Sequence, residues 1–580
     1  MADVEPILEI KNLVTAFQTR HGVFNAVDDV SLSLRPGQTL CLVGESGSGK
    51  SVLSRSILQL VDKPGRVVSG DILLHQANPS KSEHAVGTLN LAKLNPRGSI
   101  MRNIRGRDIG MIFQEPMSSL SPVHRIGDQI AESVKLHEGL AKKAAMERVI
   151  EMLRDVEIPD PENAVKKYPF EFSGGMRQRA MIAMALICNP KVLIADEPTT
   201  ALDVTIQAEI LDLLGALKEK HNMATLFITH DMGVVAETAD QVAVMRHGKL
   251  LEAGPVDQIF EAPKHEYTQA LLSAAKETQR PSERRLEMRK ARPLGDVVLS
   301  ARGLRKEFRS SGGFLGLKKN TFLALDDAVF DLREGETLGI VGESGSGKTT
   351  LARCIQRIHS IDSGELSYRD AQGSTTELAY LSDKELKPAW QDIRTVFQDP
   401  FASLNPRMTV SEIIGESLYL SGMHDKVERR DRIAELLELV GLPLAAMERF
   451  PHAFSGGQRQ RISIARAIAP NPRIVIADEA TSALDVSIRV QIMELLLDLQ
   501  EKLNISFIFI SHDVGLVRFF CDRVIVMYKG RIVEAGDTEA VCTSPQHSYT
   551  QALLSAVPIS HPKERGTQER TRYVGSNDVA

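Results

Sequence analysis

The sequence contains two copies of one long segment, and this internal repeat constrains the fold of the chain more than any other feature. Residues 44–51 recur as residues 342–349 with one Ser-to-Thr change, and residues 172–175 recur unchanged as residues 454–457. From there the offset stays at 282 residues, so Asp196 corresponds to Asp478 and His230 to His512. Solenoid and propeller repeats span only roughly 20–50 residues. The repeat therefore indicates a duplicated domain.

The spacing of the repeat predicts where the domains begin and end. We expect a first domain over residues 1–275, a linker over residues 276–298, a second domain over residues 299–557 and a polar tail over residues 558–580. The first copy has extra residues within the polar stretch 76–99, which we interpret as a surface loop. The basic linker contains Pro281 and is typical of a solvated connection, with lipid headgroup binding as the less favoured alternative. We expect the tail to be frayed or disordered.

The composition excludes several classes of protein. With 70 Lys and Arg against 75 Asp and Glu, the charge balance argues against a nucleic-acid coat. Every apolar stretch is shorter than the roughly 20 residues of a membrane span, and we find no signal segment. The five cysteines lack Cys-x-x-Cys spacing, which disfavours zinc ribbons and iron–sulfur clusters. We expect buried thiols in a reducing cytoplasm.

Short apolar runs in both copies predict the strands of a parallel sheet. Residues 38–43 and 337–341 lead into the glycine-rich stretches, while residues 192–195 and 474–477 lead into acidic pairs. Residues 226–229 and 507–511 lead into histidines. Doubly buried strands have this composition and carry functional residues at their carboxyl ends. Beyond Gln114 the apolar period becomes helical, which predicts an inserted helical arm. The expected fold is α/β, with two tandem domains that each combine a mixed, mainly parallel sheet with a helical subdomain.

A Gly-x-x-x-x-Gly-Lys-Ser/Thr loop between a strand and a helix wraps backbone N–H groups around a triphosphate. Lys50 and Lys348 are expected to reach the β- and γ-phosphates of ATP, and Ser51 and Thr349 to bind Mg²⁺. The residues of the two loops are Gly44, Glu45, Ser46, Gly47, Ser48, Gly49, Lys50, Ser51, Gly342, Glu343, Ser344, Gly345, Ser346, Gly347, Lys348 and Thr349.

Acidic pairs supply the second requirement of such a site. Asp196 and Asp478 are expected to hold the Mg²⁺ shell, and the adjacent Glu197 and Glu479 to polarise the attacking water. An acidic pair after a strand is often only a solvated strand end. Here each pair starts 23 residues after the Ser of its Ser-Gly-Gly, which favours a functional role. The two tandem α/β domains are therefore expected to be P-loop ATPase domains.

In this order, the glycine-rich loop, Gln, Ser-Gly-Gly, Asp-Glu, Leu-Asp and His resemble the nucleotide-binding domains of ABC transporters over nearly the whole chain. The resemblance implies that Gln114 and Gln398 touch Mg²⁺ and sense a transmembrane partner, and that His230 and His512 contact the γ-phosphate. Residues 201–203 and 483–485 resemble the D-loop.

The resemblance also implies a signature motif that clamps ATP from the opposite domain, and glycine N–H groups at a helix start suit an anion. One site would combine Lys50 with Ser455 and the other Lys348 with Ser173, and both are expected to hydrolyse ATP. Met176 departs from the usual Gln. Phe17 and Phe308 lie where the family stacks adenine, although they are nearly as consistent with core packing. The signature residues are Ser173, Gly174, Gly175, Ser455, Gly456, Gly457 and Gln458.

Four stretches are similar to the peptide/nickel import group, namely residues 114–122, 398–406, 263–272 and 545–554. The last two stretches are also consistent with helix starts that pack on the domain. The resemblance implies an ATPase for uptake of di- or oligopeptides, although relatives move nickel, glutathione, opines or oligosaccharides. It implies two permease subunits and an extracytoplasmic solute-binding protein as partners, pairing of the two domains within one chain, no nucleic acid, and a peripheral place on the cytoplasmic side of a bacterial inner membrane.

Two other classes of protein with tandem ATPase domains are alternatives to the importer. A soluble twin ATPase acting on ribosomes has a long charged helical linker, whereas this linker is short and contains Pro281. An excision-repair-type DNA scanner needs paired cysteines for its zinc modules, and this chain has none. A fused exporter is disfavoured by the missing spans.

Overall fold

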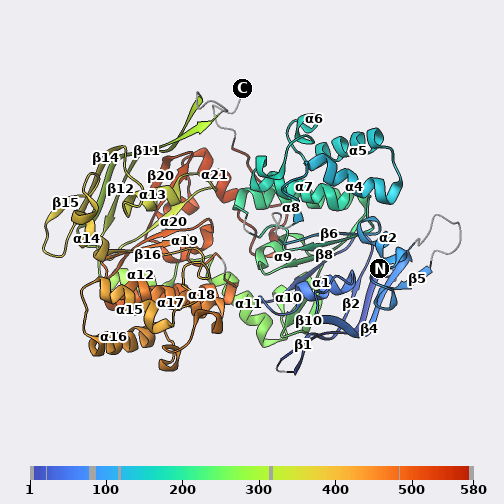
Figure 1. Cartoon of the computed structure of the whole chain (residues 1–580), viewed down its shortest axis with the longest axis horizontal. Coiled ribbons are helices and arrows are strands. Elements are labelled where there is room, and N and C mark those ends of the chain that lie inside the picture. Colours follow the sequence, from blue (N-terminus) through green and yellow to red (C-terminus); the bar gives the residue numbers. More distant parts are fainter. Residues whose placement is uncertain are drawn as a thin grey trace. The chain divides into compact units, whose positions relative to one another are not determined.

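The computed structural model describes residues 5–20, 22–77, 87–114, 119–200, 202–312, 318–482, 484–567 and 569–573. The chain forms two compact units, shown in Figure 1. Unit 1 comprises Met1–Leu202, Ile206–Ala275 and Pro558–Gln568, and unit 2 comprises Asp203–Thr205, Lys276–Val557 and Glu569–Ala580. Ala201 and Ala483, the first residues of the two expected D-loops, lie outside the described residues.

Unit 1 is built on a six-stranded sheet of order β10-β9-β3-β8-β7-β6, parallel except for the β9–β10 hairpin. Its strands are β3 (Thr39–Val43), β6 (Ile109–Ile112), β7 (Val192–Asp196), β8 (Ala224–Thr229), β9 (Gln241–Arg246) and β10 (Lys249–Pro255). All five residues of central strand β3 are buried, because the strand has neighbours on both edges and apolar layers on both faces.

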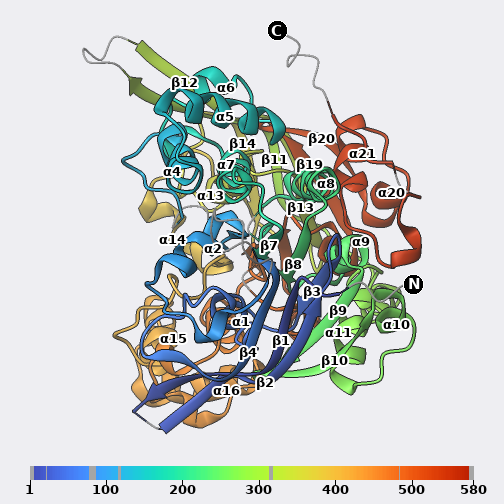
Figure 2. The same cartoon turned by 90° about the vertical axis from the view of Figure 1, so that its right-hand side faces the viewer.

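A second sheet and a set of helices complete unit 1. The sheet is antiparallel in the order β2-β1-β4-β5, from β1 (Leu8–Thr19), β2 (Gly22–Leu34), β4 (Gly65–Ala77) and β5 (Gly87–Asn90). The helices are α1 (Lys50–Ile57), α2 (Ser99–Arg107), α4 (Ile126–Glu138), α5 (Lys142–Asp155), α6 (Pro161–Ala164), α7 (Gly174–Leu186), α8 (Val204–His221), α9 (Met232–Thr238), α10 (Val256–Glu261) and α11 (Glu266–Glu277). Figures 1 and 2 show the arm α4–α7 at one end of the core sheet and the antiparallel strands at the other.

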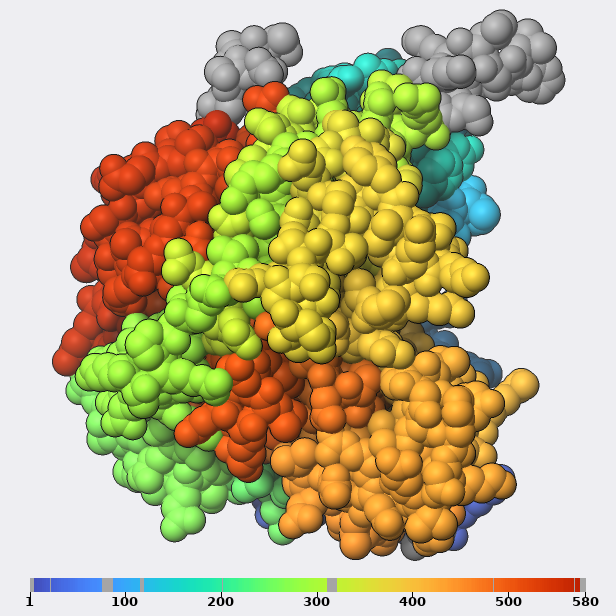
Figure 3. Space-filling view, turned by 90° about the vertical axis from the view of Figure 1, so that its left-hand side faces the viewer, coloured from blue at the N-terminus to red at the C-terminus, as the bar shows by residue number. Residues whose placement is uncertain are grey.

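Unit 2 repeats this plan. Its core sheet has the order β16-β17-β18-β13-β19-β20, and its antiparallel sheet the order β12-β11-β14-β15. The strands are β11 (Val297–Gly312), β12 (Lys318–Arg333), β13 (Thr337–Val341), β14 (Ser363–Arg369), β15 (Thr375–Glu377), β16 (Ile393–Val396), β17 (Ile474–Asp478), β18 (Ser506–Ile510), β19 (Arg523–Tyr528) and β20 (Arg531–Asp537). The helices are α12 (Glu283–Ala291), α13 (Lys348–Ile355), α14 (Asp383–Asp392), α15 (Val410–Leu420), α16 (Lys426–Leu439), α17 (Gly456–Ile468), α18 (Val486–Leu503), α19 (Val514–Phe520), α20 (Thr538–Thr543) and α21 (Ser548–Ser555). Figure 3 shows the surface around β14 and β15 (yellow) above that of α15 and α16 (orange).

The structure corrects the interpretation of residues 76–99 as one surface loop. Residues 78–86 lie outside the described residues, but Gly87–Asn90 forms strand β5, which pairs with β4. Asn90 then caps a short helical turn through its side chain. Part of the stretch therefore extends the antiparallel sheet, in which β5 is the edge strand.

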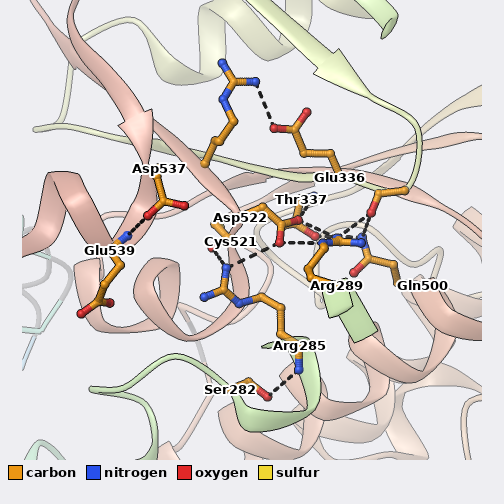
Figure 4. A network of polar contacts seen from close by, with 12 residues as sticks. Ser282, Arg285, Arg289, Glu336, Thr337, Gln500, Cys521, Asp522, Asp537 and Glu539 are labelled. Atoms are coloured by element: carbon orange, nitrogen blue, oxygen red, sulfur yellow. Dashed lines mark hydrogen bonds and ion pairs between the residues drawn. The ribbon is translucent and has the colours of Figure 1, made fainter. Parts of the chain in front are cut away.

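The interpretation of the linker as solvated holds for only part of it. Helix α12 packs on unit 2, where Arg289 donates to both carboxylate oxygens of Asp522, at 2.7 and 2.6 Å. Arg285 donates to Cys521 O and is buried, as Figure 4 shows. Arg284, Arg285 and Arg289 are thus paired with acids or carbonyls of unit 2, whereas the other four basic residues of the linker are exposed.

The described part of the tail differs from the frayed segment that its composition predicts, while Gln568 and residues 574–580 lie outside the described residues. Residues Pro558–Gln568 belong to unit 1, and Ile559 joins the apolar core there. Arg565 donates to the carbonyl oxygens of Ala236 and Ala239, at 2.7 and 2.6 Å, and so caps the end of α9. A buried isoleucine and a cap order a segment that is otherwise polar.

Two further expectations concern the whole chain. Within the described ranges, no helix combines the length and apolarity that a bilayer crossing requires. Cys41, Cys188, Cys354 and Cys521 are buried as expected, while Cys542 is half-buried.

Candidate functional site

In each unit the glycine-rich loop joins the central strand to the next helix, so α1 begins at Lys50 and α13 at Lys348. Gly49 and Gly347 precede these helices with φ of +102° and +106°, a left-handed conformation that favours glycine. A Cβ on Gly44 would lie 2.1 Å from Met245 O. The glycines are therefore required for the tight path of the backbone.

The loop lysines are buried against backbone carbonyl groups. Lys50 Nζ donates to Gly44 O at 2.7 Å and to Glu45 O at 2.9 Å, and Lys348 Nζ makes the same two bonds to its own loop, both at 2.7 Å. Burial lowers the pKa of Lys348. A poorly solvated ammonium that donates to backbone carbonyl oxygens is suited to bind phosphate oxygens instead.

The two aspartates lie beside the first turn of the helix after the loop, because strands β7 and β17 are parallel members of the core sheets. In unit 1, Ser51 donates to Asp196 Oδ1 at 3.0 Å and Ser54 to Oδ2 at 3.3 Å. In unit 2, Asp478 Oδ1 is buried and has no hydrogen-bond partner. Burial raises the pKa of both groups, and with the neighbouring charge of Glu479 it brings that of Asp478 to about 6.

Gln114 and His230, both predicted from the sequence, meet at Glu197 in unit 1, together with Thr200. Glu197 Oε2 accepts from Gln114 Nε2 at 2.9 Å and from Thr200 Oγ1 at 2.8 Å, and His230 Nδ1 lies 3.5 Å from Oε1. Glu197 has a φ of +49°, which is uncommon for a residue with a side chain and is stored strain of the kind found at functional sites.

The same meeting occurs in unit 2. Glu479 Oε2 accepts from Gln398 Nε2 at 2.6 Å, His512 Nδ1 lies 3.6 Å from Oε1, and the φ of Glu479 is +47°. Ser482, which corresponds to Thr200, instead donates to the backbone oxygen of Glu479. The Gln–Glu–His cluster is thus common to both units, and the hydroxyl contact is not.

Both glutamates are ionised at neutral pH. Burial by itself raises their pKa values, but hydrogen bonding and charge from His230 outweigh it and bring the pKa of Glu197 to about 2. His512 lowers the pKa of Glu479 in the same way, and the charge of Glu479 in turn raises the pKa of His512 against the effect of burial. Such carboxylates take up a full proton poorly but orient a water molecule well.

The signature residues begin helices α7 and α17 of the two arms. Ser173 accepts from Met176 N at 3.3 Å and Ser455 from Gln458 N at 3.4 Å, so both serines are N-caps. Gln458 Oε1 also accepts from Ser455 N at 3.1 Å and closes a capping box. Met176 has no acceptor for this second bond. Gly174 is exposed, and Gly175 packs closely on Ile206.

Sequence reasoning missed some contributors. Ser54 and Thr200 are short hydroxyl residues without a motif of their own, whereas Tyr267 and Tyr549 lie in the repeated stretches 263–272 and 545–554. Each tyrosine hydroxyl accepts a backbone N–H of the glycine-rich loop. The signal that could have identified the two tyrosines is the repeated motif itself. It contains more polar residues than the packing of a helix on the domain requires.

The aromatic residues suggested for adenine lie on the antiparallel sheets. Phe17 on β1 is half-buried and packs on Gly65, while Phe308 on β11 is 37% exposed and meets His359 edge to face at 5.3 Å. Phe308 thus offers more free ring surface than Phe17 does.

Comparisons with known proteins agree with this geometry. A family model described as ABC transporter matches residues 27–200 and 325–482, and one described as Oligopeptide/dipeptide transporter, C-terminal region matches residues 251–297 and 533–577. The chain is 46% identical to the glutathione import ATP-binding protein GsiA of Escherichia coli (strain K12), over 100% of this chain and 93% of that protein. It is 45% identical, with the same coverage, to the protein of that name in Salmonella typhimurium. A solved ATP-binding cassette bound to ADP and Pi matches 41% of this chain and 98% of its own, at 30% identity and a TM-score of 0.36.

The chain is a tandem ATP-binding cassette protein, an ATPase in which each unit supplies one cassette. It belongs to the ABC transporter family and carries the oligopeptide/dipeptide transporter C-terminal region in both halves. The expected family, fold class, ATPase activity and peptide-transporter group are therefore confirmed.

Proposed function

We propose that this chain is the ATP-hydrolysing subunit of an importer for glutathione or short peptides. One observation carries the proposal. Each half combines a glycine-rich loop and a Gln–Glu–His cluster with a peptide-transporter C-terminal region. Glutathione is itself a tripeptide, so the matched relatives and the matched family region point to the same class of solute.

Mg²⁺ fits the acidic residues of both units. Asp478 Oδ1 is a buried, unpartnered oxygen, and a hard cation prefers such a ligand. Ser51 and Asp196 would hold the ion in unit 1, Thr349 and Asp478 in unit 2, with Gln114 and Gln398 as further ligands. When bound, Mg²⁺ neutralises phosphate charge in the transition state.

The loop lysines, the glutamates and the histidines then have different roles in ATP hydrolysis. Lys50 and Lys348 exchange their carbonyl partners for β- and γ-phosphate oxygens. Glu197 and Glu479 orient the attacking water, and His230 and His512 hold the glutamates and reach toward the γ-phosphate. The positive φ of each glutamate fixes its carboxylate at the strand end.

We assign the signature residues to the partner cassette's nucleotide. Ser173, Gly174 and Gly175 would clamp ATP held by Lys348, and Ser455, Gly456, Gly457 and Gln458 would clamp ATP held by Lys50. Helix N-termini favour an anion, which supports phosphate binding at the signature residues. The aromatic face of Phe17 or Phe308 would stack adenine.

A groove in unit 2 supports a membrane partner. It has a volume of about 290 Å³ and lies between the core and the arm, with Phe397, Leu420 and Arg466 in its lining. Phe397 directly precedes Gln398, so a helix seated there would act on the Gln–Glu contact. We propose two permease subunits and an extracytoplasmic solute-binding protein as partners, and a peripheral place on the cytoplasmic face of the bacterial inner membrane.

The ATPase assignment is tested by E197Q/E479Q. Removing both carboxylates should lower phosphate release by at least about 100-fold and leave ATP binding intact, because water orientation is lost and the phosphate loop is not. Undiminished turnover in the double variant would refute the roles of the two glutamates.

The partner is tested by fractionation of cells with and without the permease subunits. We expect the chain in the membrane fraction only when they are co-expressed, and L420D in the groove should reduce this recovery. Leu444 is also exposed but lies outside the groove lining, so L444D is the matched control. Recovery on ribosomes instead would contradict the importer proposal.

The solute is tested by uptake in a strain that lacks the chain. We expect loss of labelled glutathione or dipeptide uptake, restored by the wild-type chain but not by E197Q/E479Q. Normal uptake of both compounds would remove this solute class while leaving the ATPase assignment untouched.

A further inference from the structure

One tyrosine in each unit contacts the glycine-rich loop from outside. Glu45 N donates to the Tyr267 hydroxyl at 3.0 Å, and Glu343 N donates to the Tyr549 hydroxyl at the same distance. The loop and the tyrosine are more than 200 residues apart in each half of the chain. Both copies of the repeat therefore form this contact.

The contact acts on the peptide group that seats the loop lysine. The N–H of Glu45 and the C=O of Gly44 belong to a single planar peptide unit. Tyr267 holds the N–H end, and Lys50 Nζ binds the C=O end at 2.7 Å. In unit 2 the corresponding C=O of Gly342 accepts from Lys348, also at 2.7 Å. A rotation of this peptide would therefore break the tyrosine bond and unseat the lysine together.

The repeated motif holds each tyrosine in place. His265 Nδ1 accepts from Tyr267 N at 3.0 Å, and the carboxylate of Glu252 accepts from Lys264 N and His265 N. His547 and Glu534 make the same bonds in unit 2. Because both tyrosines are buried, their rings have little freedom to turn away.

The rings are supported differently in the two units. The Arg246 guanidinium lies 4.6 Å from the centre of the Tyr267 ring. In unit 2 the corresponding residue is Tyr528, whose ring centre lies 4.4 Å from that of Tyr549, and Tyr573 of the tail adds a second ring at 5.5 Å. The hydroxyl contact is thus the shared feature, and the packing around it is not.

We infer that Tyr267 and Tyr549 are positioning residues for ATP binding, which fix the first peptide of each glycine-rich loop and through it the loop lysine. This inference rests on the ATPase function and deepens it. It also gives the stretches 263–272 and 545–554 a role in the nucleotide site.

The test compares ATP affinity in full-length chains that carry E197Q/E479Q, so that binding is read without hydrolysis. Y267F or Y549F removes only the hydroxyl, which is the acceptor for the N–H of the half-buried Glu45 or Glu343, so we expect Kd for ATP at that unit to rise about five- to tenfold. In chains with both glutamates, KM should rise by a similar factor while kcat changes less than about twofold, since seating of the lysine precedes chemistry.

The matched control is Y380F. Tyr380 donates to Gly364 O at 3.0 Å, away from the loop, and its loss should leave Kd unchanged. A lower melting temperature with unchanged Kd in Y267F and Y549F would show a merely structural role and overturn the inference. If E197Q/E479Q still hydrolysed ATP, the catalytic assignment would fail, but the Kd comparison would still decide the role of the tyrosines.

Discussion

The two cassettes carry the same motifs but surround the strand-end aspartate differently. Asp196 accepts hydroxyl bonds from Ser51 and Ser54, whereas Asp478 Oδ1 has no partner and the residue that corresponds to Ser54 is Ala352. The pKa of Asp478 accordingly reaches about 6. Asp196 thus has two hydroxyl donors, one from the glycine-rich loop and one from outside the motif, and Asp478 Oδ1 has neither.

A second pair of aspartates differs for another reason. Asp240 and Asp522 both accept a backbone N–H at the start of the central strand, from Thr39 and Thr337. Asp240 is 46% exposed and pairs with Lys218, while Asp522 is 8% exposed beneath helix α12. Helix α12 of the linker, which lies outside the repeat, thus buries Asp522, whereas the corresponding Asp240 of unit 1 is exposed.

The largest effect is expected from R289A. Without Arg289, the buried carboxylate of Asp522 loses the two hydrogen bonds that Arg289 donates. We expect this loss to lower the free energy of unfolding by about 3–5 kcal/mol. K218A in unit 1 breaks an exposed pair and should cost less than about 1 kcal/mol. Denaturant unfolding of both variants measures the difference, and equal losses would show that helix α12 contributes nothing special.

The next effect is stabilising. Without Mg²⁺, D478N should raise the unfolding free energy at pH 7 by on the order of 3 kcal/mol, because the pKa rise from 3.8 to about 6 reports a poorly solvated charge. D196N should change stability less, since two hydroxyls already solvate Asp196.

The sign of the pH dependence follows from the raised pKa of Asp478. Neutral Asp478 supports folding fully below pH 3.8, and this support is lost as the pH rises through about 6. The advantage of D478N should therefore vanish in acid. An advantage that stayed constant from pH 4 to 8 would mean that charge is not its cause.

A smaller effect tests the hydroxyl itself by exchange between units. S54A should cost unit 1 about 1 kcal/mol, and A352S should stabilise unit 2 by about the same amount, since each removes or adds one hydrogen bond to the aspartate. Thermal unfolding in EDTA checks both. If A352S destabilised unit 2, steric crowding would outweigh hydrogen bonding there.

The smallest effect concerns the start of the signature helices. M176Q should complete a capping box like that of Gln458 and stabilise α7 by about 0.5 kcal/mol. Amide exchange at the first turn of α7 measures it. Unaltered exchange in M176Q together with faster exchange at α17 in Q458M would confine the benefit to unit 2.

Much of the fold was predictable because it depends on local pattern. Apolar runs that end in functional residues identified β7, β8 and their counterparts, and the helical period identified α4 and α5. The linker and the tail were not predictable in this way. Their order comes from Asp522 and from the carbonyls of α9, which are distant in sequence.

For the candidate site, the residues were predictable and their surroundings were not. Motif spacing identified Glu197 and His230, but nothing in it places Thr200 on the same carboxylate or leaves Asp478 without a partner. Hydrogen bonding and burial depend on side chains that approach from other elements.

The sequence by itself therefore determined the duplication, the two cassettes and the residues expected to bind and hydrolyse ATP, because these follow from the order and spacing of the motifs. Only the tertiary structure decided how the two sites differ, and that Tyr267 and Tyr549 belong to them. The physical reason is that a pKa or a peptide orientation is set by whichever groups lie within a few ångströms, and folding brings such groups from more than 200 residues away.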